Sequence, residues 1–441
     1  MNRSLGNVRW SVRERRHLGC LRRGVLAFVL ISLPALLFAS DCPSAQPFQT
    51  VEGEHIVLLA DSGSRQSLEL LVQSFDAAVP QWQRFWGIPR GSLRGWKVKA
   101  CVMNDVDAFR ASGDLPLELS IPFGYALGDN IWVRRQSSEY YTRHLLLHEG
   151  VHALAIHQFG GTGPSWYAEG LAELLSVHRD AGADVRINVV PDSRDAVPFW
   201  GRFKLMTQRR GSGGVPTIDR VLEYPLDLKS DVESYGWSWA VAMLLTEYPE
   251  YRGSYLKAAR NGNDRTEAFT QTMRSELRAQ WPIVQARWRL LAETLDYGFD
   301  WKRERVALAM SDPLWDGRPV SVEIAADEGW QSLGIRFAPG TKLSLRAAGR
   351  CTLADTPKPW ISEPSGVTIE YAGGRPIGQL LVAELPNATS EQKELRPLDI
   401  QTLENSLEIN VEQHCWLVFR VNDHLAGRGD NRGGYAITVT R

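Results

Sequence analysis

Residues 139–159 read EYYTRHLLLHEGVHALAIHQF, the most informative segment in the first half of the chain. Its apolar residues recur at helical spacing. On a helix, His148 and His152 are one turn apart, so both imidazoles project from one face and can bind the same metal ion. Glu149 lies between them, where its carboxylate can hold a metal-bound water and accept its proton. The alternative is a chance pattern, which arises in roughly one chain of this length in a hundred.

A second motif follows, because residues 166–173 read WYAEGLAE. Glu169 lies seventeen residues beyond His152, and Glu173 follows Glu169 by one helical turn. Pro164 and Ser165 mark the start of this predicted helix. Two carboxylates one turn apart suit a metal ligand and an acceptor for the other N–H of a metal-bound imidazole. A solvent-facing pair of acids is the alternative.

Together the two segments resemble the paired motifs of the gluzincins, the metallopeptidases of the MA clan, in which a WLxEGLAEY-like segment follows HExxH. The resemblance covers about residues 50–300. It implies an α+β zincin-like fold in which His148, His152 and Glu169 bind zinc and Glu149 is the general base. It also implies that Glu173 orients His148. Two imidazoles and one carboxylate leave a coordination position for water or substrate.

The same resemblance suggests two further elements. Residues 124–133, GYALGDNIWV, match the edge strand that pairs with the substrate backbone in gluzincins; a plain hairpin is the alternative. Tyr235, in SYGWSW, resembles the Tyr of a YxxSW segment and could donate a hydrogen bond to an oxyanion. Packing of its ring in the core is the alternative. His144 and His157 do not fit the ligand pattern, so we expect them to lie on the helix surface or behind the ligands.

The 441 residues have room for two or three domains. Residues 54–135 alternate strand-like runs with one helix, and residues 139–310 are mostly helical. From about Val320 the apolar period switches to two, with repeated Gly, Pro and Asn turns, which indicates an all-β sandwich or barrel. We therefore predict a metallopeptidase-like domain over 45–310 and a β domain over 315–441.

Residues 422–434 read NDHLAGRGDNRGG and lie between two predicted strands. Such a composition suits Ca²⁺, although a simple turn is the commoner outcome. The segment resembles the NDxxxxxGNNSG loop of calcium-dependent galactophilic bacterial lectins, and that resemblance extends over about residues 319–441. It implies a jelly-roll, galactose-binding-like sandwich with Asp423, Gly427, Asp430 and Asn431 as calcium ligands. This sequence departs from the lectin pattern in two respects: the His-Pro-Asp-Gln stretch that contacts sugar has no counterpart here, and Gly427 replaces a Thr.

The N-terminus has the pattern of an export signal. Residues 1–23 are rich in Arg with Glu14 as the one acid, and residues 24–39, GVLAFVLISLPALLFA, are apolar and end in small residues. The apolar run is shorter than the ~20 residues that span a bilayer. We predict a signal peptide over 1–40 and an exported protein, periplasmic or secreted, with an uncleaved membrane anchor as the alternative.

Cysteine usage agrees with export, because removal of the leader leaves an even number of cysteines. Their positions favour the pairs Cys42–Cys101 and Cys351–Cys415, and disulfides persist in oxidising compartments. Buried free thiols are the alternative.

Charge is balanced, with 50 Lys and Arg against 51 Asp and Glu, so the composition does not indicate nucleic-acid binding. Two functions remain. The first is a zinc metallopeptidase that acts on a peptide or protein. The second is a catalytically silent envelope or glycan-binding protein with a zincin scaffold. The presence of Glu149 favours the enzyme, because a scaffold has no need of the base.

Overall fold

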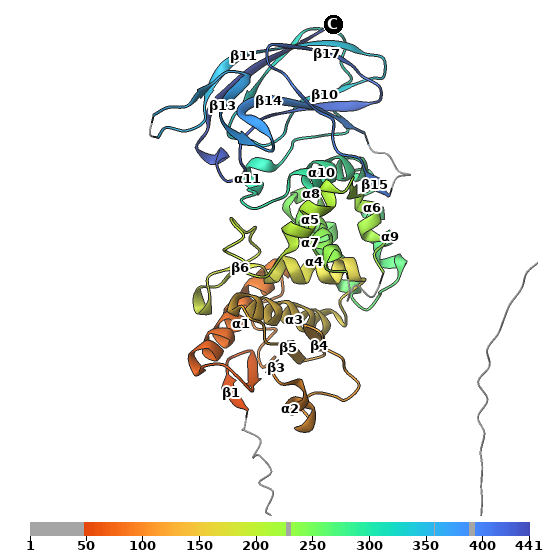
Figure 1. Ribbon diagram of the computed structural model, residues 1–441. Coiled ribbons are helices and arrows are strands. Elements are labelled where there is room, and N and C mark those ends of the chain that lie inside the picture. Colours follow the sequence, from red (N-terminus) through yellow and green to blue (C-terminus); the bar gives the residue numbers. More distant parts are fainter. Residues whose placement is uncertain (1–47, 226–230, 357, 388–392) are drawn as a thin grey trace, which may run out of the picture. The chain divides into compact units, whose positions relative to one another are not determined.

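The two-histidine segment forms a single helix, α3 (Glu139–Phe159), in the computed structural model, which describes residues 48–225, 231–356, 358–387 and 393–441 (Figure 1). The hydroxyl of Ser138 accepts a hydrogen bond from the backbone N–H of Tyr141 and caps the first turn. Gly160, in the left-handed conformation, ends the helix. Twelve residues of α3 are buried, including His148 and Glu149. The predicted metal-binding helix is therefore a core element.

A five-stranded sheet lies next to α3. Its strand order is β1-β2-β3-β5-β4, in which β2, β3 and β5 run parallel and β4 is the antiparallel edge strand. The helices α1 and α3 both contact this sheet. The bounds are β1 (Gln49–Glu52), β2 (Ile56–Ala60), α1 (Arg65–Trp86), β3 (Val98–Met103), α2 (Val106–Ala111), β4 (Gly124–Leu127) and β5 (Asn130–Arg134).

The second motif lies on α4 (Ser165–Ser176), which packs against α3 and α7 (Val232–Glu247). A Cβ at Gly170 would lie 2.5 Å from the carbonyl oxygen of Ser238, so the backbones of α4 and α7 approach as closely as a glycine allows. The remaining elements of this half are β6 (His178–Arg179), η1 (Gly182–Asp184), β7 (Arg186–Ile187), α5 (Arg202–Gly211), β8 (Val215–Pro216), α6 (Ile218–Leu222), α8 (Pro249–Ala258), η2 (Ala259–Asn261), α9 (Glu267–Glu276), α10 (Trp281–Thr294) and α11 (Trp301–Glu304).

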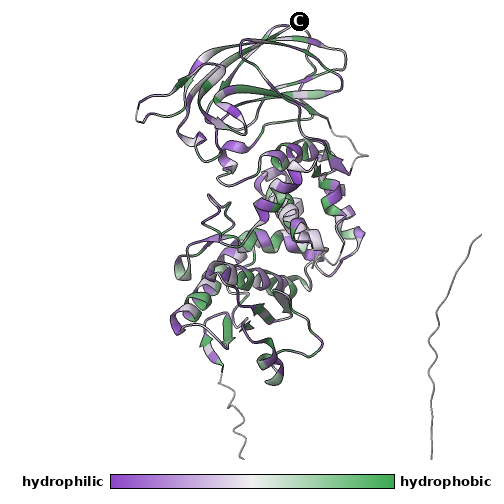
Figure 2. Ribbon diagram, in the orientation of Figure 1, coloured by the Kyte–Doolittle hydropathy of each residue, from purple (hydrophilic) through white to green (hydrophobic). Residues whose placement is uncertain are grey.

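The C-terminal part is built from two antiparallel sheets. One has the order β10-β18-β14-β13 with β16 on β14, and the other has the order β12-β11-β19-β9 with β17 on β11. Hydrophobic and hydrophilic residues both occur along these strands (Figure 2). A core that includes Phe337, Leu345, Phe419 and Ile437 draws residues from both sheets. The bounds are β9 (Val320–Ala325), β10 (Gln331–Phe337), β11 (Lys342–Thr352), β12 (Ile361–Ser362), β13 (Ser365–Ala372), β14 (Arg375–Pro386), β15 (Glu394–Leu395), β16 (Ile400–Thr402), β17 (Ser406–Asn410), β18 (Cys415–Val421), η3 (Arg428–Asp430) and β19 (Arg432–Thr440).

Mixed α and β structure thus precedes a pair of β sheets in the C-terminal half, as the change of apolar period predicts. The switch occurs between α11 and β9, and the gap between the two predicted domains, residues 311–314, falls in this connection. The domain limits themselves stay a prediction. The predicted signal segment lies outside the described residues. Among the helices that are described, none combines the length and the apolar character needed to cross a bilayer.

The predicted Cys351–Cys415 disulfide is wrong. Both thiols are free and buried, and they lie on β11 and β18, which belong to different sheets. Each thiol has its own partner, because Cys351 Sγ donates to the Tyr435 hydroxyl and Cys415 Sγ lies 3.8 Å from a carboxylate oxygen of Glu384. Cys101 is also a buried free thiol, but Cys42 lies outside the described residues, so that pair stays a prediction.

Candidate metal centre

Two helices bring His148, His152 and Glu169 together. One ligand atom from each residue lies within 4.8 Å of the others. The Nε2 atoms of His148 and His152 are 3.1 Å and 3.5 Å from Oε2 of Glu169. The imidazoles come from α3 and the carboxylate from α4, and the side chains of His152 and Glu169 are partly exposed, at 14% and 21%. The three predicted ligands therefore form one cluster that is accessible from outside.

The donor set of this cluster fits a zinc ion. Zinc takes imidazole nitrogen and carboxylate oxygen, and a catalytic zinc has three protein ligands. Burial alone would raise the pKa of Glu169, but His152 and a hydrogen bond from His148 outweigh burial and lower this pKa to about 2. Among the described residues, no Lys or Arg forms an ion pair with Glu169. A bound cation would thus meet a charged carboxylate that is not already neutralised by arginine or lysine.

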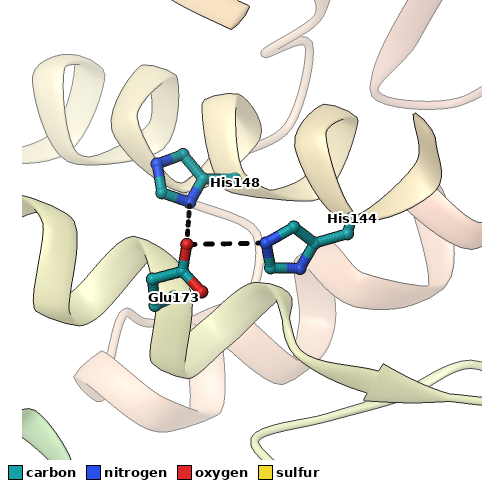
Figure 3. A group of neighbouring side chains, drawn as sticks. All are labelled: His144, His148 and Glu173. Carbon is teal, nitrogen blue, oxygen red and sulfur yellow. Dashed lines mark ion pairs between the residues drawn. The ribbon is translucent and has the colours of Figure 1, made fainter. Parts of the chain in front are cut away.

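His148 also belongs to a second cluster, with His144 and Glu173, which Figure 3 shows. Both imidazoles come from α3 and face the same carboxylate oxygen on α4. The distances from Oε1 of Glu173 are 3.7 Å to His148 Nδ1 and 3.6 Å to His144 Nε2. Glu173 and His144 are fully buried. Glu173 thus lies behind His148, on the side opposite Glu169.

Sequence reasoning missed the two groups that hold Glu173. Arg202 Nη2 donates to Oε1 of Glu173 at 2.6 Å, and the indole N–H of Trp200 donates to Oε2 at 2.9 Å. Burial would raise the pKa of Glu173, but the Arg202 guanidinium holds it well below its usual range. Arg202 is the first residue of α5, and Trp200 lies two residues before it. Apolar residues in this stretch do not recur at a regular spacing. No local signal in that stretch marks them.

The neighbouring arginine decides which cluster suits a metal. In the cluster of His144, His148 and Glu173, a cation would lie beside the Arg202 guanidinium in a fully buried site, where like charges repel strongly. Glu173 there is an acceptor for protein donors. The cluster of His148, His152 and Glu169 has no such cation and has partial access to solvent. We therefore assign the candidate metal centre to the latter.

Glu149 lies beside this centre and close to the edge strand β4. Its side chain is buried, with 6% of the residue exposed. Burial raises the pKa of Glu149 to about 8, although His152 acts in the opposite direction. A Cβ at Gly124 on β4 would lie 2.5 Å from Oε1 of Glu149, so the backbone of the edge strand reaches the carboxylate only because residue 124 is a glycine.

Tyr235 lies near the first turn of α7, with its ring centroid 6.2 Å from that of His148. The guanidinium carbon of Arg202 is 5.3 Å from the Tyr235 ring centroid. Burial raises the pKa of Tyr235 above its usual value, so its hydroxyl keeps the proton and remains a donor at neutral pH. The described residues thus place a phenol next to the first histidine of the candidate centre.

A cavity of about 450 Å³ opens beside the candidate centre. This volume lies within the range of small-molecule and peptide side-chain sites. His148, Glu149 and Tyr235 contribute to its wall. The other lining residues come from β4 and the segment that leads into it, from α3 and the segment before it, from α4, from the loop before α5, and from α5 and α7: Ser120, Pro122, Phe123, Gly124, Tyr125, Gln136, Tyr141, Leu145, Glu173, Phe199, Trp200, Gly201, Arg202, Lys204, Leu205 and Val232.

The two other histidines of α3 differ from each other. His157 is 39% exposed and lies 3.8 Å from Asp129 on the surface. His144 is fully buried and faces Glu173, and burial lowers its pKa, which keeps the imidazole neutral. His157 is thus a surface residue, and His144 lies behind the ligands.

Two of the predicted calcium ligands, Asp423 and Asn431, form a hydrogen bond with each other. Asp423 Oδ2 accepts a hydrogen bond from Asn431 Nδ2 at 2.9 Å, and Asn431 Oδ1 is buried without a hydrogen-bond partner among the described residues. Arg428, within the same loop, is buried and pairs with Glu304. Gly427 lies close to Asp423, because a Cβ there would be 3.5 Å from Asp423 Oδ1. Asp430 is exposed at the end of η3.

Comparisons with known proteins do not identify a family. No family model matches the chain, and no curated protein matches it. Among solved structures, the EclA N-terminal domain, a PllA-like lectin, is 18% identical with a TM-score of 0.21, over 27% of this chain and 94% of the lectin. PliG of Aeromonas hydrophila, a periplasmic inhibitor of g-type lysozyme, is 5% identical with a TM-score of 0.18, over 31% and 97% of the two chains. Likenesses of this size carry no argument about function.

Proposed function

We propose that this protein is a zinc-dependent hydrolase of peptide bonds that acts outside the cytoplasm. The observation that carries the proposal is the convergence of His148, His152 and Glu169 beside the buried carboxylate of Glu149. A zinc ion held by two imidazoles and one carboxylate would polarise a carbonyl and lower the pKa of a bound water. The export signal over residues 1–40, on which the proposed location depends, is a sequence prediction.

Each remaining role falls to a residue of the chain. Glu149, buried beside the centre, accepts the proton of the attacking water and delivers it to the leaving amine. The Tyr235 hydroxyl donates to the oxyanion. The edge strand β4 aligns the substrate backbone by strand addition, next to Glu149. Glu173 orients His148 from behind, held by Arg202.

The test measures zinc and hydrolysis separately in the full chain. Elemental analysis should find about one zinc per chain in the parent and none in His148→Ala/His152→Ala. His157→Ala, on the same helix but outside the cluster, is the matched control and should keep zinc. Glu149→Gln should keep zinc and lose hydrolysis of an end-blocked peptide mixture. A parent that takes up no zinc after reconstitution would overturn the proposal, and zinc without hydrolysis would favour the silent scaffold.

We also propose that the loop of residues 422–431 binds Ca²⁺ and that the β domain contacts glycans of the cell envelope. The unpartnered Oδ1 of Asn431, together with the Asp423 carboxylate, supports the calcium part, because hard oxygen ligands suit this ion. Binding of Ca²⁺ by calorimetry, in the parent and in Asp423→Asn, tests it. Equal heats in both proteins would remove Asp423 from the site. Retention on envelope glycans, with and without Ca²⁺, tests the glycan part.

A further inference from the structure

The cavity beside the candidate centre has an unusual wall residue, Phe199. The backbone N–H of Trp200 donates to the carbonyl of Val197 at 3.2 Å, so residues 197–200 form a turn with Pro198 in its second position. Phe199 occupies the third position with φ of +69°. A Pro followed by a residue with positive φ is typical of a type II turn, in which the third residue is usually Gly. A bulky side chain with this φ is strained.

Burial does not explain why Phe occupies this position. Phe199 is 71% exposed, whereas its neighbours Val197 and Trp200 are buried. Trp200 is also fixed by its hydrogen bond to Glu173, 2.9 Å long, and by edge contact with Trp239 at 5.0 Å between ring centroids. A rigid turn therefore presents an exposed aromatic ring at the cavity. Backbone strain of this kind is commonly found at functional sites.

Other exposed apolar side chains share the cavity with Phe199. Among the described residues, Phe123, Tyr125 and Val232 line it as well, with exposed fractions of 45%, 36% and 37%. Phe123 and Tyr125 flank Gly124, whose backbone lies against Glu149. Apolar groups that are grouped and exposed around a concave site gain free energy when a ligand covers them. The cavity wall thus favours a substrate with an apolar group next to the reacting bond.

The charged residues that line the cavity disfavour the binding of a basic substrate side chain. Of the carboxylates among the described lining residues, Glu173 is paired with Arg202, and Glu149 is reserved for the reaction. The exposed ammonium group of Lys204 also lines the cavity. An arginine or lysine of a substrate would therefore find a cation and no available carboxylate, whereas an apolar side chain would find four apolar neighbours.

We propose that Phe199 is a specificity-determining residue and that the substrates are peptides with a large apolar side chain, aromatic or branched aliphatic, next to the scissile bond. The side chain enters the cavity and packs against Phe199 and Phe123. This inference rests on the proposed peptidase function and names the class of substrate for the same site.

The experiment compares Phe199→Gly with the parent in the full, zinc-loaded chain. Cleavage sites in an end-blocked peptide mixture, read by mass spectrometry, should show enrichment of Phe, Tyr, Leu or Ile at one position flanking the bond in the parent. In Phe199→Gly this enrichment should disappear. With a matched pair of peptides carrying Phe or Ala at that position, the ratio of kcat/KM should fall about tenfold or more, mainly through KM.

Two control variants change a residue with positive φ and an exposed apolar side chain at positions outside the cavity. Asn188→Gly changes another residue with positive φ, +57°, away from the cavity, and Leu117→Ala removes an apolar side chain that is 80% exposed and outside the lining. Both should keep the parent's preference. Phe199→Leu should keep most of it, because Leu is also large and apolar. The thermal midpoint of Phe199→Gly should rise, since Gly adopts the turn without strain.

Failure of this inference differs from failure of the proposed function. Binding of the two peptides to Glu149→Gln, measured by calorimetry, does not depend on hydrolysis. A parent that cleaves peptides, with Phe and Ala peptides bound and cut equally well, would overturn the role of Phe199. An unchanged preference in Phe199→Gly would do the same. A parent without zinc or hydrolysis, whose Glu149→Gln variant still prefers the Phe peptide, would sink the peptidase proposal and leave the apolar cavity as a binding site.

Discussion

A buried Arg–Glu pair lies in each of the two regions whose sequences suggest a metal site. In the helical region Arg202 pairs with Glu173, and in the C-terminal loop Arg428 pairs with Glu304. The first pair holds the acceptor behind His148, on the side of this imidazole opposite Glu169. The second pair takes its cation from within the predicted calcium loop itself. The same kind of interaction thus holds an acceptor behind one candidate site and ties the loop of the other to α11.

A helix motif and a loop motif differ in how strictly they fix the positions of their side chains. Ligands spaced four residues apart on one helix are placed by helix geometry, whatever the rest of the chain does. Ligands in a loop depend on every backbone angle between them, and a single buried side chain such as Arg428 can change the charge at the site.

Removal of one carboxylate from each pair should separate their roles. Glu173→Gln and Glu304→Gln each leave a buried guanidinium without its ionic partner, which should lower the free energy of unfolding by about 3–5 kcal/mol. Zinc affinity should fall about 10–100-fold in Glu173→Gln, because the orientation of His148 is lost. It should stay unchanged in Glu304→Gln. Chemical denaturation and zinc titration measure both quantities.

The double variant Glu173→Gln/Arg202→Met is the control for folding, since it removes both charges and should recover much of the stability. Equal zinc affinities in Glu173→Gln and Glu304→Gln would show that the carboxylate behind His148 has no special role.

Acid should destabilise the helical region through His178, which stacks on Tyr140 with ring centroids 4.4 Å apart. Burial, followed by the charge of Arg143, lowers its pKa to about 3. Because the folded-state pKa lies below the unfolded value of about 6.5, the unfolded chain binds more protons between these limits. Stability should therefore fall as the pH drops from about 6.5 towards 3, by a few kcal/mol at most.

His178→Gln should flatten the pH dependence in this window, measured by denaturation at several pH values. The exposed His157, changed to Gln, is the matched control and should leave the slope as it is in the parent. A parent slope that survives in His178→Gln would assign the effect to other groups.

Calcium should raise the thermal midpoint of the parent if the C-terminal loop binds it. The gain is limited by mass action to about 3 kcal/mol at a hundredfold excess over the dissociation constant. Asp423→Asn should abolish the shift, whereas Asp399→Asn, outside the loop, should not. No shift in the parent at millimolar Ca²⁺ would remove the loop as a calcium site.

The smallest expected effect concerns the thiols of the C-terminal sheets. Burial raises the pKa of Cys415 to about 12 and also raises that of Cys351, so both should be protonated at pH 8. The thiolate is the reactive form, so alkylation of the native protein should be slow at both positions. After denaturation without reductant, both should react fully. A pair that reacts only after reduction would restore the disulfide.

Part of the candidate site follows from spacing, because helical periodicity places His148 and His152 on one face of a helix. The choice of Glu169 as the third ligand came from the resemblance to the gluzincin motifs. The anchoring of Glu173 by Trp200 and Arg202 could not be predicted, since these contacts span 27 and 29 residues and depend on how a loop without apolar period returns to α4. The order of strands in the two sheets likewise depends on long-range packing.

The lack of a side chain at Gly170 determines how closely α4 and α7 pack beside the candidate site. Gly170 follows the predicted ligand Glu169, and its missing Cβ lets α4 touch the backbone of α7, the helix that carries Tyr235. Any side chain at this position would wedge the two helices apart. The carboxylate and the phenol would then move relative to each other, although neither had been changed. The relative position of the Glu169 carboxylate and the Tyr235 phenol therefore depends on Gly170, which has no functional group of its own.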